Sequence, residues 1–184
     1  QEMRVISPSS SANLGSGYDV LAVAHDAFFD VLEIETQPSS ETEVLIESEG
    51  VPLDPRKNSA SYAVLRMLEE LNLKQKVKIR LWKGVPAGLA AGSAHPDNVA
   101  ASVVGGFVAV VSQSPLKVVS IPHNVDVEFA LFIPEVRIEQ KTKKARELVP
   151  KEIPTNKYVE NLRFATALIL GLQKGDRDLI RLGL

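Results

Sequence analysis

The stretch PSSSANLGSGYD, residues 8–19, decides how the rest of the chain is interpreted. It combines small, turn-forming residues with an amide, Asn13, and a carboxylate, Asp19. We expect a loop between two strands that exposes backbone N–H groups and places both side chains in one pocket. An amide can donate and accept hydrogen bonds, and a carboxylate can hold an ammonium group. Taken alone, the same composition also suits an ordinary solvated turn.

A second polar stretch, GSAHPDNVA, covers residues 92–100. Pro96 favours the first position of a helix and Asp97 its first turn. A helix N-terminus presents free N–H donors and favours anions, so His95 and Asn98 could face a ligand there. The alternative is a plain helix start in which His95 is structural.

The third stretch, KTKKAR, covers residues 141–146. Thr142 and Arg146 are four residues apart and share one face of a helix. A hydroxyl and a guanidinium together suit a carboxylate or a phosphate. The alternative is a solvated basic helix.

Composition narrows the class of protein. A chain of 184 residues with net charge −2 is long enough for one domain or two small ones and lacks the basic stripe of a nucleic-acid binder. Cysteine is absent, which excludes disulfides and cysteine nucleophiles and fits a reducing cytosol. No apolar run has the roughly 20 residues that span a bilayer. We therefore expect a cytoplasmic protein with neither a membrane nor a nucleic-acid partner.

Periodicity predicts an α+β fold, because helical and strand patterns intermix without strict alternation. Helices are expected from Asn58 or Ser59 to Leu71, from Pro96 to Val104, over 142–148, over 158–172 and after Gly175-Asp176. Strands are expected at 4–7, 27–35, 43–49, 77–82, 107–111, 117–121 and 127–132.

Together the three stretches resemble the homoserine kinase branch of the GHMP small-molecule kinases. Residues 8–19 resemble that branch's P-x-S-x-A-N-L-G-x-G-[FY]-D motif, residues 92–100 its G-S-x-H-x-D-N-V-A segment, and residues 142–146 its T-x-x-A-R segment. The resemblance implies a two-domain fold. Its N-terminal half, residues 3–114, would be ribosomal protein S5 domain 2-like, and its C-terminal half, residues 115–184, ferredoxin-like. The turn at 112–115 is the expected boundary.

The resemblance also implies ATP-dependent phosphorylation of L-homoserine to O-phospho-L-homoserine in threonine biosynthesis, with ATP and Mg²⁺ and a homodimeric enzyme. The residues implied to hold the substrate are Asn13, Asp19, His95, Asp97, Asn98 and Arg146. Asn13, Thr142 and Arg146 would also serve catalysis, without a dedicated base. The residues implied to bind the nucleotide are Asn58, Lys83, Pro86, Gly88 and Leu89.

One family motif is incomplete. The phosphate loop P-x-x-x-G-L-G-S-S-A-A begins at Pro86-Ala87-Gly88-Leu89, but Ala90-Ala91-Gly92-Ser93 follows directly, without the Gly-Ser-Ser core and the acidic magnesium ligand. Either the natural protein has further residues between Leu89 and Ala90, or the loop is deleted. A deletion would expose apolar surface, which favours the first explanation. The family also usually continues beyond a point like Leu184 and supplies a second arginine there.

Three alternatives to a homoserine kinase stay open. The chain could be another GHMP kinase that acts on a mevalonate-type alcohol. It could be a non-catalytic relative that binds an amino acid, if the loop is truly deleted. It could also be an interaction domain whose polar loops carry no chemistry, in which case replacing Asp19 or Arg146 would be silent.

Overall fold

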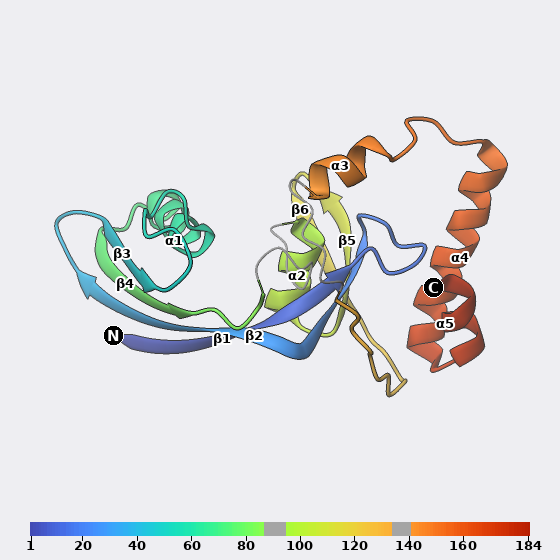
Figure 1. Ribbon diagram of the computed structural model, residues 1–184, viewed down its shortest axis with the longest axis horizontal. Coiled ribbons are helices and arrows are strands. Elements are labelled where there is room, and N and C mark those ends of the chain that lie inside the picture. Colours follow the sequence, from blue (N-terminus) through green and yellow to red (C-terminus); the bar gives the residue numbers. More distant parts are fainter. Residues whose placement is uncertain (87–94, 134–140) are drawn as a thin grey trace. The chain divides into compact units, whose positions relative to one another are not determined.

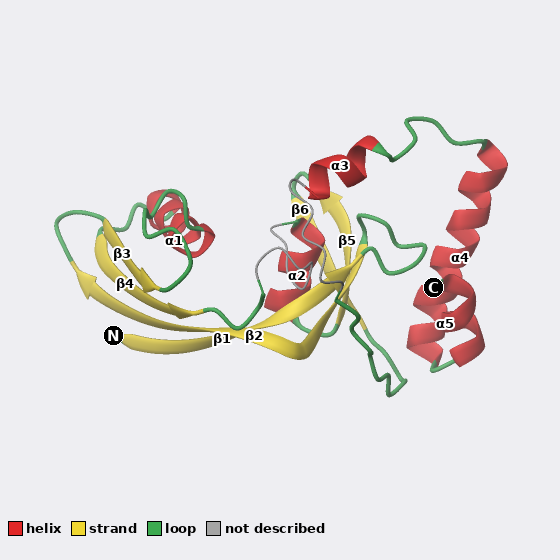
Figure 2. Cartoon of the chain, in the orientation of Figure 1, coloured by secondary structure: helices red, strands yellow, loops and turns green. Residues whose placement is uncertain are grey.

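The computed structural model describes residues 1–86, 95–133 and 141–184, with side chains in the last range from Lys144 onward (Figures 1 and 2). The chain divides into two compact units. The first contains residues 1–8 and 28–85, and the second contains residues 9–27 and 86–184. Strands β1 (Glu2–Ala12) and β2 (Leu21–Pro38) contribute residues to both units.

The first unit is a sheet covered by one helix. Strand β4 (Gln75–Trp82) pairs antiparallel with β2 and parallel with β3 (Glu43–Ser48). Helix α1 (Ser59–Glu70) lies against one face of these strands (Figure 2). Its buried Leu68 packs on the apolar residues that alternate along β3 and β4, including Val44, Ile46, Val77 and Ile79. This alternation is the period-two pattern that predicted both strands.

The second unit has helices on both faces of its strands. Strand β5 (Phe107–Gln113) pairs with the start of β2 and with β6 (Leu116–Ile121). Helix α4 (Thr155–Lys174) buries Leu168 and Leu172 against one face, formed by Leu21, Phe107 and other apolar residues. Helix α2 (Pro96–Val104) buries Ala100 and Ala101 against the opposite face. Helices α3 (Lys141–Glu147) and α5 (Arg177–Gly183) complete the unit, and α5 packs against α4 (Figure 1).

The predicted helices are confirmed, together with their boundary signals. Asn58 caps α1, because its side-chain oxygen accepts hydrogen bonds from the backbone N–H groups of Ala60 and Ser61. Pro96 occupies the first turn of α2, and Gly105 ends it. Gly175 ends α4 in the left-handed conformation that glycine adopts without strain.

Two local predictions are wrong. Residues 8–12 were expected to belong to a loop, yet β1 continues through Ala12, and Ser9 and Ser10 are almost fully buried. Their hydroxyls make hydrogen bonds inside the unit, so small polar residues are accommodated in a strand. Residues 127–132 alternate as a strand would, but they form no regular element, because no described strand pairs with them. Phe132 at their end is largely exposed.

The division into compact units differs from the predicted domain boundary. Residues 112–115 lie at the hairpin that joins β5 to β6, and Gln113 pairs directly with Leu116. The predicted boundary after residue 114 concerns the two-domain organisation of the family and stays a prediction. Within the described parts of the chain, no helix has the length and apolar character needed to cross a membrane.

Candidate active site

The loop between β1 and β2 is shaped by two residues in left-handed backbone conformations. Asn13 has φ +58° and Asp19 has φ +55°. Asn and Asp tolerate this region better than other side chains. The Oδ1 atom of Asn13 accepts a hydrogen bond of 2.8 Å from the backbone N–H of Asp19, which closes the loop on itself. Asn13 therefore fixes the position of Asp19, the carboxylate that the sequence singled out.

The last two helices hold this loop in place. Ser16 donates to the carbonyl oxygen of Gly183 through both its backbone N–H (3.1 Å) and its hydroxyl (2.7 Å). The side-chain amide of Asn161, on α4, donates to the Ser16 carbonyl at 3.1 Å. A Cβ atom on Gly15 would lie 2.5 Å from the Cα of Leu184, so only glycine fits there. Neither Ser16 nor Asn161 is a predicted site residue, because their contacts join segments that lie far apart in the sequence.

Asp19, His95 and Arg146 come together in the second unit. Nη2 of Arg146 lies 3.4 Å from Oδ2 of Asp19 and 3.3 Å from Nδ1 of His95. The Asp19 and Arg146 side chains are 36% and 52% exposed, so both remain open to an incoming molecule. One carboxylate, one guanidinium and one imidazole thus converge from a loop, the start of α2 and the end of α3. The sequence predicted these residues as one group.

Asp97 and Asn98, also predicted to hold substrate, are buried at the start of α2. The Asp97 carboxylate accepts from the backbone N–H of Asn98 at 2.9 Å. The Asn98 amide donates to the backbone oxygen (3.3 Å) and to the hydroxyl (3.1 Å) of Ser10, and that hydroxyl donates to the Asn98 carbonyl. These bonds hold the first turn of α2 against β1, and His95 lies at the N-terminus of this helix. A direct substrate contact by Asp97 or Asn98 stays a prediction.

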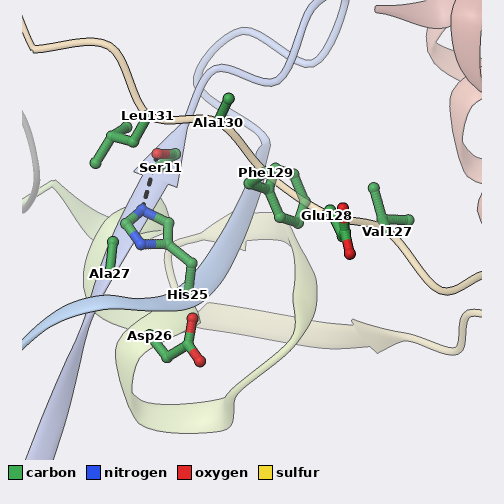
Figure 3. A pocket seen from close by; sticks show the side chains of 9 residues that line it. All are labelled: Ser11, His25, Asp26, Ala27, Val127, Glu128, Phe129, Ala130 and Leu131. Carbon is green, nitrogen blue, oxygen red and sulfur yellow. Dashed lines mark hydrogen bonds between the residues drawn. The ribbon is translucent and has the colours of Figure 1, made fainter.

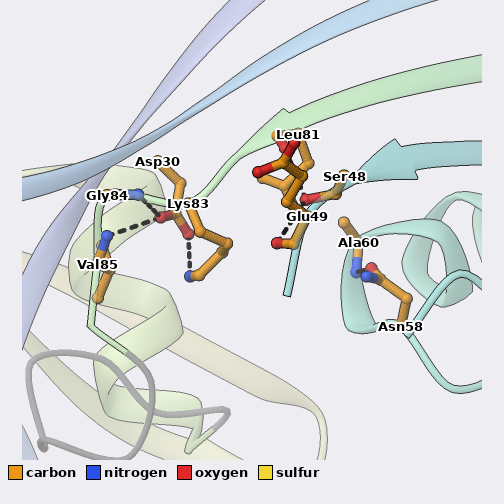
Figure 4. A network of polar contacts seen from close by, with 9 residues as sticks. All are labelled: Asp30, Ser48, Glu49, Asn58, Ala60, Leu81, Lys83, Gly84 and Val85. Carbon is orange, nitrogen blue, oxygen red and sulfur yellow. Dashed lines mark hydrogen bonds and ion pairs between the residues drawn. The ribbon is translucent and has the colours of Figure 1, made fainter. Parts of the chain in front are cut away.

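Lys83 is the predicted nucleotide-binding residue with the clearest surroundings. Its ammonium forms an ion pair with the Asp30 carboxylate, which also accepts hydrogen bonds of 2.9 Å from the backbone N–H groups of Gly84 and Val85 (Figure 4). Lys83 lines an open pocket of about 830 Å³ in the first unit. Trp82, which lines the same pocket, is 51% exposed.

The structure describes only two of the other residues predicted to bind the nucleotide, Asn58 and Pro86. The Asn58 side chain is buried and fully engaged: besides capping α1, its amide donates to the carbonyl of Pro52 at 3.2 Å. A contact with adenine therefore stays a prediction. Pro86 is the last described residue before the gap. Gly88, Leu89 and the side chain of Thr142 lie outside the described residues, so their predicted roles remain untested.

A second pocket, of about 510 Å³, surrounds His25 in the second unit (Figure 3). The His25 ring lies between two serine hydroxyls of β1: Nδ1 is 2.9 Å from Ser9 Oγ, and Nε2 is 3.1 Å from Ser11 Oγ. Burial lowers the pKa of His25 below its usual 6.5, and neighbouring Asp26 opposes this shift. No signal in the sequence links His25 to these serines, so this arrangement could not be predicted.

No metal site is evident in residues 1–86, 95–133 and 141–184, where no three acidic, histidine or cysteine side chains are grouped for coordination.

Solved structures identify the class of protein that this fold and site define. The fold is that of the GHMP small-molecule kinases. The homoserine kinase of Cytophaga hutchinsonii superposes with a TM-score of 0.82 at 28% identity, over 99% of this chain and 71% of that protein. Mevalonate diphosphate decarboxylase of Staphylococcus aureus shares the fold alone, with a TM-score of 0.56 at 10% identity over 96% of this chain and 68% of that protein. The predicted fold class is confirmed.

Curated relatives then narrow the class. A homoserine kinase of Sulfurisphaera tokodaii is 47% identical over 215 residues, which cover 96% of this chain and 70% of the relative. One of Sulfolobus acidocaldarius is 46% identical with the same coverage. The chain belongs to the homoserine kinase family, although no family model matches it. The matched region is longer than the chain itself, so the relatives carry residues inside it that this chain lacks.

Proposed function

We propose that this protein is a homoserine kinase, which transfers the γ-phosphoryl group of ATP to the side-chain hydroxyl of L-homoserine. Membership of the homoserine kinase family supports this assignment. The observation that carries it in the structure is the convergence of Asp19, Arg146 and His95.

The charges of this cluster suit a free amino acid. Homoserine carries an ammonium and a carboxylate on one carbon, so its site needs a carboxylate and a cation a few ångströms apart. Asp19 would hold the ammonium and Arg146 the carboxylate, the latter by the paired N–H bonds that guanidinium groups make. His95 beside them would help to orient the substrate. A mevalonate-type alcohol has no ammonium group, and Asp19 would then face the substrate carboxylate with an unfavourable like charge.

The nucleotide would bind to the first unit. Lys83 supplies a cation at the open pocket there, and Trp82 supplies an exposed aromatic surface on which a base can stack. Binding of ATP should therefore quench the fluorescence of Trp82, the only tryptophan in the chain. Magnesium would accompany ATP and neutralise phosphate charge.

Phosphoryl transfer needs positioning and charge stabilisation more than it needs a strong base. Asn13 and Asp19 fix the loop, Arg146 supplies positive charge, and the hydroxyl proton can pass to the phosphate itself. We assign no base role to Asp97, because its buried carboxylate is engaged with the N-terminus of α2. Thr142 is proposed to contact the reacting hydroxyl or the transferred phosphate.

Whether the protein can catalyse phosphoryl transfer depends on the junction between Leu89 and Ala90, where the phosphate loop belongs. We propose that the natural protein has a complete phosphate loop here, since the relatives carry additional residues within the matched region. Exposed valines on α2, among them Val103 at 80%, are consistent with a covering segment. Peptide mapping of the natural protein across Leu89 and Ala90 tests this point. Additional residues between Leu89 and Ala90 support a complete loop, and a peptide in which the two residues are directly joined supports a binding protein that retains only the amino-acid pocket.

A substrate panel tests the reaction itself. We expect ATP-dependent phosphorylation of L-homoserine and none of mevalonate. A coupled assay of ADP release measures the rate, and mass spectrometry identifies the product. Phosphorylation of mevalonate without that of homoserine would overturn the proposal. A homoserine-induced rise in Tm with no response to ATP and magnesium would instead identify the non-catalytic relative. Threonine biosynthesis, a cytoplasmic location and a homodimer remain parts of the proposal.

A further inference from the structure

We propose that Asp30 is a positioning residue for nucleotide binding, which acts by fixing the Lys83 ammonium and the backbone of Gly84 and Val85. This inference rests on the proposed function, in which Lys83 faces the nucleotide. Asp30 lies on β2, far in sequence from the nucleotide-binding segment, and it belongs to none of the three motif stretches.

Both carboxylate oxygens of Asp30 accept hydrogen bonds from residues 83–85, the segment that follows β4. Oδ1 accepts hydrogen bonds of 2.9 Å from the N–H groups of Gly84 and of Val85, and Oδ2 binds the Lys83 ammonium (Figure 4). The side chains are 17% exposed for Asp30 and 30% for Lys83, so solvent screens this pair less than a surface pair. Three consecutive residues therefore depend on one side chain.

The Asp30 carboxylate accepts backbone hydrogen bonds from the segment just beyond the last paired residues of β2 and β4. Val31 and Trp82 are the last paired residues of β2 and β4 on this side. Beyond them, the N–H groups of Gly84 and Val85 bond to the Asp30 side chain. Gly84 also lies directly against β2, because a Cβ on it would come within 2.1 Å of the Phe29 carbonyl oxygen. The segment after β4 is thus fixed to Phe29 by close packing and to Asp30 by hydrogen bonds.

A lysine side chain that is already fixed loses less conformational entropy when it binds a ligand than a flexible one does. The lysine stem is flexible, and an unpaired ammonium loses much conformational freedom when it binds a nucleotide. Asp30 restricts that freedom before the nucleotide arrives. Its negative charge opposes an anionic nucleotide at the same time, so simple Coulomb attraction predicts tighter ATP binding when Asp30 is neutralised. Positioning predicts weaker binding, and the two accounts are separated by the sign of the change.

The experiment compares Asp30→Asn and Asp30→Ala with wild type by calorimetry with ATP and with homoserine, and by steady-state kinetics. Asp30→Asn keeps an oxygen for the two N–H groups but removes the charge and the second oxygen, which binds the Lys83 ammonium, whereas Asp30→Ala removes every bond. We expect Asp30→Ala to raise the Kd and KM for ATP roughly tenfold, the loss of one charged hydrogen bond. Asp30→Asn should raise them less, and the KM for homoserine should not change in either variant.

Two further variants complete the design. Glu43→Gln removes an ion pair with Lys76 at the other end of β4, and it should leave ATP binding unchanged. Adding Asp30→Ala to Lys83→Met should weaken ATP binding less than Asp30→Ala does in wild type, because the part of the effect that depends on Lys83 is already lost. Tighter ATP binding by Asp30→Asn, an unchanged Kd in Asp30→Ala, or equal effects on both substrates would each overturn the inference while wild type still binds ATP. If wild type itself binds no ATP, the proposed function fails and this inference falls with it.

Discussion

Arg146 donates a hydrogen bond to Asp19 across 3.4 Å, so the cation and the carboxylate proposed to bind opposite ends of homoserine bind each other. Exposed ion pairs of this kind contribute about 0–1 kcal/mol to stability. A zwitterionic ligand can therefore separate the two side chains at little cost, replacing one mutual contact with a partner for each. In the proposed function, this ion pair keeps both groups close together until the amino acid arrives.

The first prediction concerns these two charges. Asp19→Asn and Arg146→Gln should each raise the KM for homoserine roughly tenfold or more, because each removes a charged partner worth about 1.5–3 kcal/mol. The KM for ATP should change little. Lys144→Gln is the matched control, since it removes an exposed positive charge from the same helix. Equal effects of Lys144→Gln and Arg146→Gln on homoserine would reduce the role of Arg146 to general electrostatic attraction.

The second prediction concerns Gly15 in the substrate loop. Gly15→Ala should destabilise the protein by about 2–4 kcal/mol, from a strained backbone and a clash with the last residues of the chain. Gly15 has φ +49°, and its Cβ would lie 2.5 Å from Leu184 Cα. Gly50→Ala is the control, because Gly50 has φ +73° but nothing within 4 Å of its Cβ. Urea unfolding should show the larger loss for Gly15→Ala, and equal losses would mean that the contact with Leu184 contributes nothing.

The third prediction is a pH dependence of stability. Burial lowers the pKa of His25, so the unfolded chain binds the proton more readily than the folded one. Stability from this group is complete above the unfolded value of 6.5 and declines as the pH falls through 6.5 towards the lower folded value. The serine hydroxyls on either side can donate or accept, so they do not oppose protonation. The free energy of unfolding, measured from pH 8 down to pH 5, should fall below pH 6.5.

Two variants identify the group responsible. His25→Gln should flatten the pH dependence, since glutamine can still bond to a serine hydroxyl but does not titrate. His123→Gln is the matched control, because it replaces a histidine that contacts Phe107 and leaves His25 and its serine partners in place. If both variants retain the wild-type profile, another group causes the decline.

The fourth prediction separates the structural role of Asn58 from a nucleotide contact. Asn58→Ala should cost about 1–2 kcal/mol of stability through loss of the α1 cap. Asn58→Asp keeps the capping oxygen but turns a second oxygen towards the Pro52 carbonyl, so in chemical denaturation it should retain the contribution of the cap and lose that of the Pro52 bond. Weaker ATP binding by a stable Asn58→Asp protein would support the predicted position near adenine. Unchanged binding would assign Asn58 to the helix cap alone.

Local signals in the sequence were enough to predict the helices. Asn58, Pro96 and Gly175 act within a turn or two of their own positions, and each is observed at the helix end it was expected to mark. The cluster of Asp19, His95 and Arg146 could also be predicted, but from the family motifs and not from periodicity. Their functional roles stay predictions.

Contacts distant in sequence could not be predicted in this way. Ser9, Ser10 and Ser11 suggest a turn by composition, but hydrogen bonds from His25 and Asn98 accommodate them in a strand. Residues 127–132 have the alternation of a strand, but a strand forms only where a partner strand lies beside it. Asp30 carries no motif, and its importance follows from the register of β2 and β4.

The double hydrogen bond between Ser16 and Gly183 has a consequence for synthesis of the protein. The two residues are 167 positions apart, so the loop that carries Asp19 emerges from the ribosome long before its support exists. Closing so large a loop is slow compared with forming local helices. The loop that carries Asp19 is therefore fixed late, after α4 and α5 have been translated, and a nascent chain that stalls before residue 183 would carry the motif without the support of Gly183.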